Sequence, residues 1–205
     1  MKRWRNLTFV SAALVIVNIA VFFVSSLPGK QLLSLGDLNL YSVMADREYY
    51  RVLTAMFLHA DMQHLFNNML ILFFLGNMIE EKVGHVWYGF FFFLSGIGGN
   101  LASLWLKFRT NDPVGSIGAS GVVFGLDGVL LALVLFSGSR MEHVTAKRVV
   151  LMIFLSLYSG YTGHNIDNAA HMGGLITGFV LGSIYCLITG GTFRHNRSQD
   201  NAMWR

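Results

Sequence analysis

The sequence predicts an all-α protein, a polytopic bundle of six membrane-spanning helices in one domain that covers residues 1–205. Of these residues 54% are hydrophobic and only 13% are charged, and the mean hydropathy is +0.52. A soluble domain normally carries about 25% charged residues. Because each span needs about 20 apolar residues, six spans account for nearly all of the chain and leave no room for a second folded domain.

The apolar runs give the bounds of the six spans, and a more polar stretch separates the first span from the second. We place the spans at about residues 7–27, 64–80, 86–107, 120–137, 148–160 and 168–189. The first follows basic residues as a signal peptide would, but its apolar run exceeds the usual 7–15 residues, so we interpret it as a retained span. Residues 28–58 form a lateral loop that is too polar to span, and we expect short helices in the membrane interface there.

The second span begins with His64 and Asn68, which share one helix face because they are four residues apart. Both side chains can donate hydrogen bonds to a developing negative charge. The alternative is a polar clamp between two helices. The third span opens with a mostly aromatic run at residues 87–93, which is typical of an anchor at the membrane interface.

The fourth span opens with Gly118-Ala119-Ser120-Gly121. At a helix start the backbone N–H groups have no helical acceptor and can hold an anion. A serine there could attack a carbonyl while its own N–H stabilises the oxyanion. The alternative is a serine N-cap in a glycine-rich turn.

The sixth span, which follows a short fifth one, carries His171 one turn from its start. Small residues at four-residue spacing let helices approach closely. Such residues are Gly174, Gly178 and Gly182 on this span and Gly121 and Gly125 on the fourth. Close packing would bring His171 within hydrogen-bonding distance of Ser120 as its general base. Asp167 either orients His171 or, as we prefer, caps the helix.

Lysine and arginine predict the orientation of the chain. The side that holds both termini has ten: Lys2, Arg3, Arg5, Lys82, Arg140, Lys147, Arg148, Arg194, Arg197 and Arg205. The other side has five: Lys30, Arg47, Arg51, Lys107 and Arg109. This bias puts both termini in the cytoplasm. The net charge of +4 then reflects loop topology and not nucleic-acid binding.

These residues together resemble the signatures of the rhomboid intramembrane serine proteases. The matching segments are His64-Leu65-Phe66-Asn67-Asn68, Gly118-Ala119-Ser120-Gly121 and residues 170–178 around His171. The resemblance implies a bacterial-type six-span core in the plasma membrane. It implies Ser120 as nucleophile, His171 as base, and His64, Asn68 and the Ser120 N–H as oxyanion hole.

The resemblance also implies roles outside the catalytic pair. The substrates that it implies are membrane-anchored proteins, which are cut in or near a transmembrane segment. Residues with gate or structural roles are Phe124, Gly118, Gly174, Gly178, Glu48 and Arg51, with the cap over the site at residues 159–165. Phe124 stands where the family often has a tyrosine stacked on the histidine. No cofactor is implied, and the seven histidines contain no His-Glu-x-x-His pattern that predicts a metal site.

Asp127 departs from the family, which typically has an apolar residue near this position. A carboxylate inside a span is costly, so we expect a neutral group hydrogen-bonded to another helix, with Asn18 or Asn100 as partner. A small transporter that uses Asp127, His64 and His171 as a proton relay is the rival hypothesis. A catalytically inactive relative that serves as a binding module is a weaker one, because Ser120 and His171 are intact.

Overall fold

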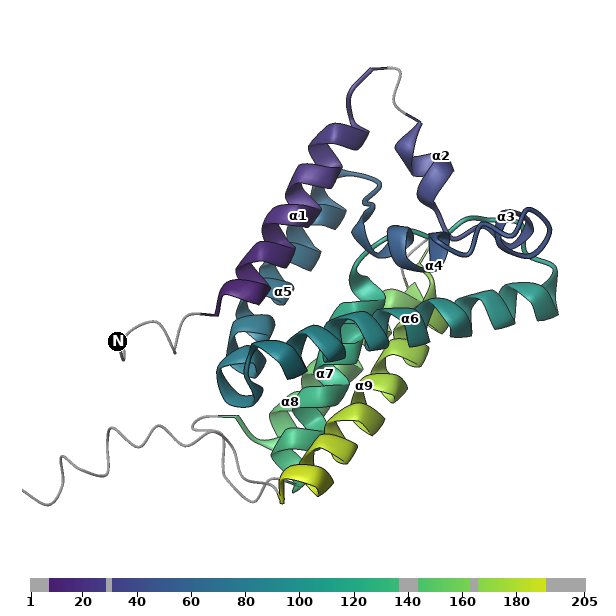
Figure 1. The fold of residues 1–205 in the computed structure, drawn as a ribbon. Coiled ribbons are helices and arrows are strands. Elements are labelled where there is room, and N and C mark those ends of the chain that lie inside the picture. The colour runs from purple at the N-terminus through teal and green to yellow at the C-terminus, as the bar shows by residue number, and fades with distance from the viewer. Residues whose placement is uncertain (1–7, 29–30, 137–143, 163–165, 191–205) are drawn as a thin grey trace, which may run out of the picture.

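The computed structural model describes residues 8–28, 31–136, 144–162 and 166–190 (Figure 1). Its longer helices are α1 (Phe9–Ser25), α5 (Met62–Val83), α6 (His85–Thr110), α7 (Ser120–Phe136), α8 (Ala146–Thr162) and α9 (Asn168–Thr189). Each begins and ends within three residues of a predicted span. The described ranges contain no strand, so the all-α prediction is confirmed.

Two of the described helices, α6 and α9, are long and apolar enough to cross a membrane by length and composition. The helices α1 and α7 are also apolar but have 17 residues each. The count of six spans therefore stays a prediction. Figure 1 shows α1 beside α5 on one side of the molecule and α7, α8 and α9 together on the other, with α6 crossing between the two groups.

The lateral loop forms short helices, as its composition predicts. These are α2 (Leu32–Gly36), α3 (Leu40–Met44), α4 (Arg51–Thr54) and the 3₁₀ turn η2 (Ala55–Phe57). They lie along one side of α6 in Figure 1. Asn39 caps α3, because its side chain accepts hydrogen bonds from the N–H groups of Tyr41 and Ser42.

The buried guanidinium of Arg51 holds the lateral loop together. Its Nη1 lies 2.5 Å from Asp37 Oδ1, and its Nε lies 2.6 Å from Glu48 Oε2. Nη1 also donates to the carbonyl oxygens of Ser34 at 2.9 Å and Asp37 at 3.0 Å. A planar group with several fixed donors can bind both carboxylates and carbonyls at once. Arg51 therefore joins the end of α2 to the start of α4.

The helices α7 and α9 touch backbone to backbone through glycines. Gly174 lies against the carbonyl of Gly121, and Gly178 lies against the carbonyl of Gly125; a Cβ atom at either α9 position would overlap that oxygen. Gly99 brings α6 to the same place, since a Cβ there would lie 2.7 Å from the carbonyl oxygen of Ala170. The glycines predicted from the sequence thus set the separation of α7 and α9, and Gly99, which was not predicted, adds α6.

On the other side of the molecule, Glu80 of α5 caps α1. Its fully buried carboxylate accepts hydrogen bonds from the N–H groups of Val10 at 3.0 Å and Ser11 at 2.7 Å. It also lies 2.6 Å from Nδ1 of His85. Thr8, the residue before α1, makes no side-chain cap of its own. The first N–H groups of α1, which have no helical acceptor, are satisfied by another helix.

We predict that Gly178→Ala destabilises the protein, because the new methyl group has no room beside the Gly125 carbonyl. Overpacking typically costs about 1–3 kcal/mol, and the midpoint of thermal unfolding in detergent measures the loss. Gly89→Ala in α6 is the matched control. A Cβ at Gly89 meets nothing within 4 Å, so this change should be neutral or should stabilise by up to about 1 kcal/mol. Equal midpoints for the two variants would contradict the close-contact interpretation.

We predict that Arg51→Ala lowers the unfolding midpoint, with a loss of about 3 kcal/mol, because two carboxylates and two carbonyls lose their donor. Arg47→Ala is the control in the same loop. Arg47 is exposed, and a surface substitution normally changes stability by less than about 0.5 kcal/mol. Loss of activity in Arg51→Ala at an unchanged midpoint would argue against a structural role.

Candidate active site

The first residue of α7 and a residue one turn into α9 form the central contact of the site. Ser120 Oγ lies 2.8 Å from His171 Nε2. This distance is in the range that a general base needs to take a proton from a nucleophile. His171 is 6% exposed, and its Nδ1 has no hydrogen-bond partner among the described residues. The predicted pairing of Ser120 with His171 is therefore present, without a carboxylate on the far nitrogen.

The backbone contacts of α7 and α9 produce this pairing. Ser120 directly precedes Gly121, and His171 precedes Gly174 by three residues. Gly121 and Gly174 are one of the two glycine pairs whose backbones touch. The imidazole is further held by Phe124, one turn along α7. The two rings stack with centroids 4.3 Å apart and an angle of 21° between their planes. Phe124 thus supplies the stacking surface that the sequence predicted.

Gly118 allows the loop before α7 to pass close to other catalytic candidates. Its φ of +131° belongs to a conformation that side chains disfavour. A Cβ at this position would lie 2.8 Å from His64 Nε2 and 3.7 Å from Ser120 Oγ. The His64 ring and the Ser120 hydroxyl therefore face the same small space beside Gly118. Its N–H donates to the carbonyl of Ala55 at 2.9 Å, which fixes the loop.

His64 and Asn68 lie on the first turns of α5. Asp61 caps this helix by accepting a hydrogen bond from the His64 N–H at 2.8 Å. Asn68 is 6% exposed, and its Nδ2 has no partner among the described residues. A buried amide donor that is unsatisfied in the resting structure is available for a bound group. The structure thus brings His64 to the serine loop and leaves the Asn68 amide available.

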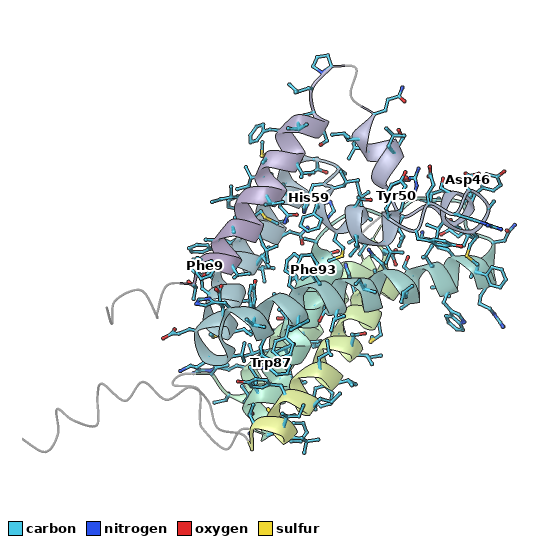
Figure 2. The ribbon with its side chains drawn as sticks, in the orientation of Figure 1. Phe9, Asp46, Tyr50, His59, Trp87 and Phe93 are labelled. Atoms are coloured by element: carbon cyan, nitrogen blue, oxygen red, sulfur yellow. The ribbon has the colours of Figure 1, made fainter. Side chains whose placement is uncertain are left out.

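His59 is a neighbour of the site that the sequence reasoning missed. Its ring contacts that of His64, with centroids 5.1 Å apart and an edge-to-face angle of 68°. The residue is labelled in Figure 2. It is 1% exposed, and neither ring nitrogen has a partner among the described residues. Burial, helped by the nearby His64, lowers the pKa of His59 to about 4. His64 therefore has a neutral neighbour. The five-residue spacing from His64 gave no signal of this contact.

Asp167 acts as a cap, as preferred from the sequence, and does not contact the His171 ring. Its Oδ1 accepts a hydrogen bond from the Ala170 N–H at 2.9 Å. Its Oδ2 accepts from Ser116 Oγ at 2.6 Å and from the hydroxyl of Ser103. Burial alone would raise the pKa of Asp167, but these three hydrogen bonds and the positive charge of Lys107 outweigh burial and lower the pKa. Neither serine was singled out from the sequence.

Asp127 does not have the partners expected for it. The residue is buried in α7 at 3% exposure, and its Oδ1 has no hydrogen-bond partner among the described residues. The Asn18 amide donates to the carbonyl of Leu14 in its own helix, and the Asn100 amide donates to the carbonyl of Val52. Both amides prefer backbone carbonyls, so the expectation that one of them would hold Asp127 is wrong.

Two further expectations concern the surroundings of the site. In the predicted cap, residues 159–162 belong to α8, and residues 163–165 lie outside the described residues. Among the described residues, no group of three His, Cys, Asp or Glu lies close enough to share a metal ion.

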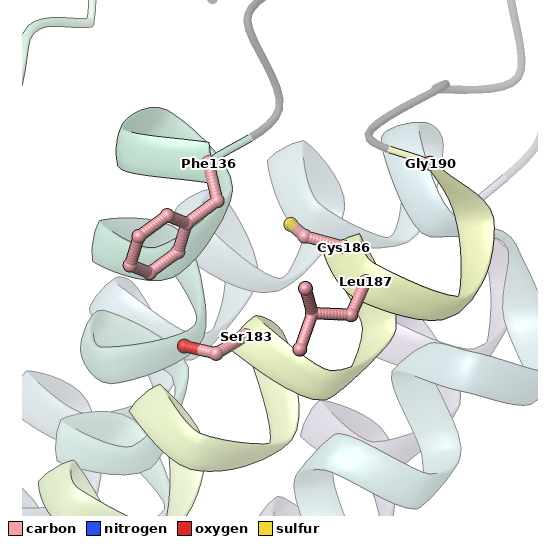
Figure 3. A pocket seen from close by; sticks show the side chains of 5 residues that line it. All are labelled: Phe136, Ser183, Cys186, Leu187 and Gly190. Atoms are coloured by element: carbon pink, nitrogen blue, oxygen red, sulfur yellow. The ribbon is translucent and has the colours of Figure 1, made fainter.

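A cavity of about 370 Å³ lies at the far ends of α7 and α9 from the dyad (Figure 3). Its lining consists of Phe136, Ser183, Cys186, Leu187 and Gly190. The Ser183 hydroxyl donates to the carbonyl of Phe179 at 2.7 Å in its own helix. Among the described residues that line the cavity there is no His, Asp, Glu or Lys that could act as a base for this serine.

Comparisons with known proteins point to a single family. Residues 46–188 match the family model of the Rhomboid domain. RHOMBOID-like protein 1 of Arabidopsis thaliana is 35% identical over 155 residues, which is 75% of this chain and 39% of that relative. Rhomboid protease GluP of Bacillus subtilis is 33% identical over 152 residues, 74% of this chain and 29% of that relative. The putative rhomboid protease YdcA of Bacillus subtilis is 30% identical over 146 residues, 70% of each chain. The chain thus spans well under half the length of the first two relatives.

We predict that Asp127→Asn leaves the rate at which a serine-reactive probe labels Ser120 near the wild-type value, because no contact links the carboxylate to the dyad. Asp127→Val should raise the unfolding midpoint, since an unpaired buried polar group typically costs about 1–3 kcal/mol. Loss of labelling in Asp127→Asn at the wild-type midpoint would contradict this and would support a proton-relay role.

Proposed function

The chain belongs to the rhomboid family, and from this membership and the contact of Ser120 with His171 we propose that it is an intramembrane serine endopeptidase. Its substrates are membrane-anchored proteins, which it cuts in or near a transmembrane segment. The single observation that carries the proposal is the distance of 2.8 Å between a serine hydroxyl and an imidazole at the starts of two packed helices. A purely structural serine cap has no need of that histidine.

The reaction begins with proton transfer across this contact. Ser120 Oγ donates its hydrogen to His171 Nε2 and attacks the carbonyl carbon of the scissile peptide, whose oxygen becomes negative. The imidazolium then gives the proton to the leaving amine as the C–N bond breaks, which leaves an acyl group on Ser120. A water molecule, deprotonated by His171, attacks the acyl carbon. The imidazolium then returns this proton to Ser120 Oγ as the ester bond breaks, which releases the carboxyl product and restores the serine and the neutral imidazole.

The oxyanion forms beside Gly118, in the space that the His64 ring and the Ser120 hydroxyl share. His64, Asn68 and the Ser120 N–H are its donors. The Ser120 N–H is the first of α7 and therefore has no acceptor within its helix. The unpaired amide of Asn68 supports the same role, because a preorganised donor needs no rearrangement when charge develops.

Without a carboxylate on Nδ1, the orientation of His171 depends on packing. The stacked Phe124 ring fixes the plane of the imidazole. The closely packed backbones of Gly121 and Gly174 fix its distance from the serine. A hydroxyl on the stacking ring is unnecessary for this function, so Phe124 serves in place of the tyrosine common in the family. We further propose that both termini lie in the cytoplasm, so that the dyad opens toward the outer face.

The test is labelling in detergent by a fluorophosphonate, which reacts with activated serines. We predict that the wild-type protein is labelled and cleaves a single-span model substrate. Ser120→Ala should abolish both, because the attacking oxygen is gone. His171→Ala should also abolish both, and the double variant should lose no more than either single one, since the two groups act as a unit.

Oxyanion variants provide the internal control for this test. His64→Ala and Asn68→Ala should slow cleavage by about 10²–10³ while the folded protein still reacts with the probe. Ser183→Ala, at the other end of α9, should retain full labelling. Labelling that persists in Ser120→Ala would refute the assignment. Absence of labelling and cleavage in folded wild-type protein would favour the rival transporter hypothesis.

A further inference from the structure

Ser116 connects the lateral loop to the loop that carries the nucleophile. Its N–H and carbonyl pair with those of Leu38 in an isolated antiparallel bridge, with N to O distances of 3.3 and 2.8 Å. Leu38 follows Asp37, the carboxylate that Arg51 binds. That carboxylate also lies against Gly115, where any Cβ would overlap it. The position of the lateral loop is thus transmitted to a residue four positions before Ser120.

The side chain of Ser116 makes a second connection, to the helix of the base. Its hydroxyl donates to Asp167 Oδ2, while Asp167 Oδ1 accepts from the first turn of α9. Asp167 is four residues before His171, and Ser116 is four residues before Ser120. One hydrogen bond therefore links the approach segments of both members of the dyad. The other hydroxyl on Oδ2 belongs to Ser103 of α6 and not to the nucleophile loop.

Resting on the proposed function, we propose that the Ser116–Asp167 hydrogen bond is a positioning contact that sets the reactive distance between Ser120 and His171. The loop needs such a contact because glycine at positions 115 and 118 leaves its backbone permissive. The lowered pKa of Asp167 supports the proposal, since an ionised carboxylate accepts from both serines at once. The hydrogen bonds of the two side chains go to each other, to the Ala170 N–H and to Ser103, so we assign both a role that acts through the dyad.

The two serines on Asp167 supply a matched pair of variants. Ser116→Ala removes the link to the nucleophile loop, and Ser103→Ala removes a similar hydrogen bond to α6. We expect Ser116→Ala to lower kcat about tenfold at an unchanged KM, since a misplacement of about 1 Å can cost up to about 10² in rate. Ser103→Ala should keep kcat within about twofold of wild type, although its unfolding midpoint falls. Ser116→Thr, which keeps the hydroxyl, should restore kcat.

Asp167→Ser tests the same contact from the other side. Serine is a good N-cap, but it is too short to reach Ser116, so this variant should match Ser116→Ala in kcat. Combining the two should cause no further loss. The proposal is overturned if Ser116→Ala turns over at the wild-type kcat, or if both serine variants lose kcat in proportion to their loss of stability. Unlabelled wild-type protein would instead refute the protease function itself.

Discussion

Backbone contact between α7 and α9 is the constraint on which the rest of the structure depends. With no side chain between them at Gly121, Gly125, Gly174 and Gly178, the two helices approach to the distance of touching main chains. That distance brings a serine hydroxyl and an imidazole together at their starts. The lateral loop, the capping carboxylate of Asp167 and the stacked Phe124 ring refine an arrangement that the glycines already impose.

The sequence predicted the helices and the reactive pair because each left a local pattern. Apolar runs marked the helix bounds to within three residues, and glycines at four-residue spacing indicated close packing of two helices. The dyad followed because Ser120 and His171 stand at matching ends of two such helices. Patterns of this kind are local, so one sequence is enough to read them.

What the sequence could not predict depends on tertiary contacts. Nothing local distinguishes Ser116 or Ser103 from other serines, and their meeting on Asp167 joins segments separated by 51 and 64 residues. Asn18 and Asn100 were matched to Asp127 by their depth in the membrane alone, yet each amide donates its hydrogen bond to a backbone carbonyl. Depth along a helix says little about the direction in which a side chain points around it. His59 lies in the connection between η2 and α5, where its spacing from His64 gave no pattern to read.

The cap that Glu80 provides for α1 has a consequence for which substitutions this chain can accept. Both carboxylate oxygens bind main-chain N–H groups, of Val10 and Ser11, and main-chain groups are the same whatever residue occupies the position. The docking of α1 is therefore encoded in α5. Substitutions at the start of α1 can accumulate without loss of this anchor, provided that the helix still begins there. A substitution of Glu80, by contrast, would remove the cap whatever residues begin α1.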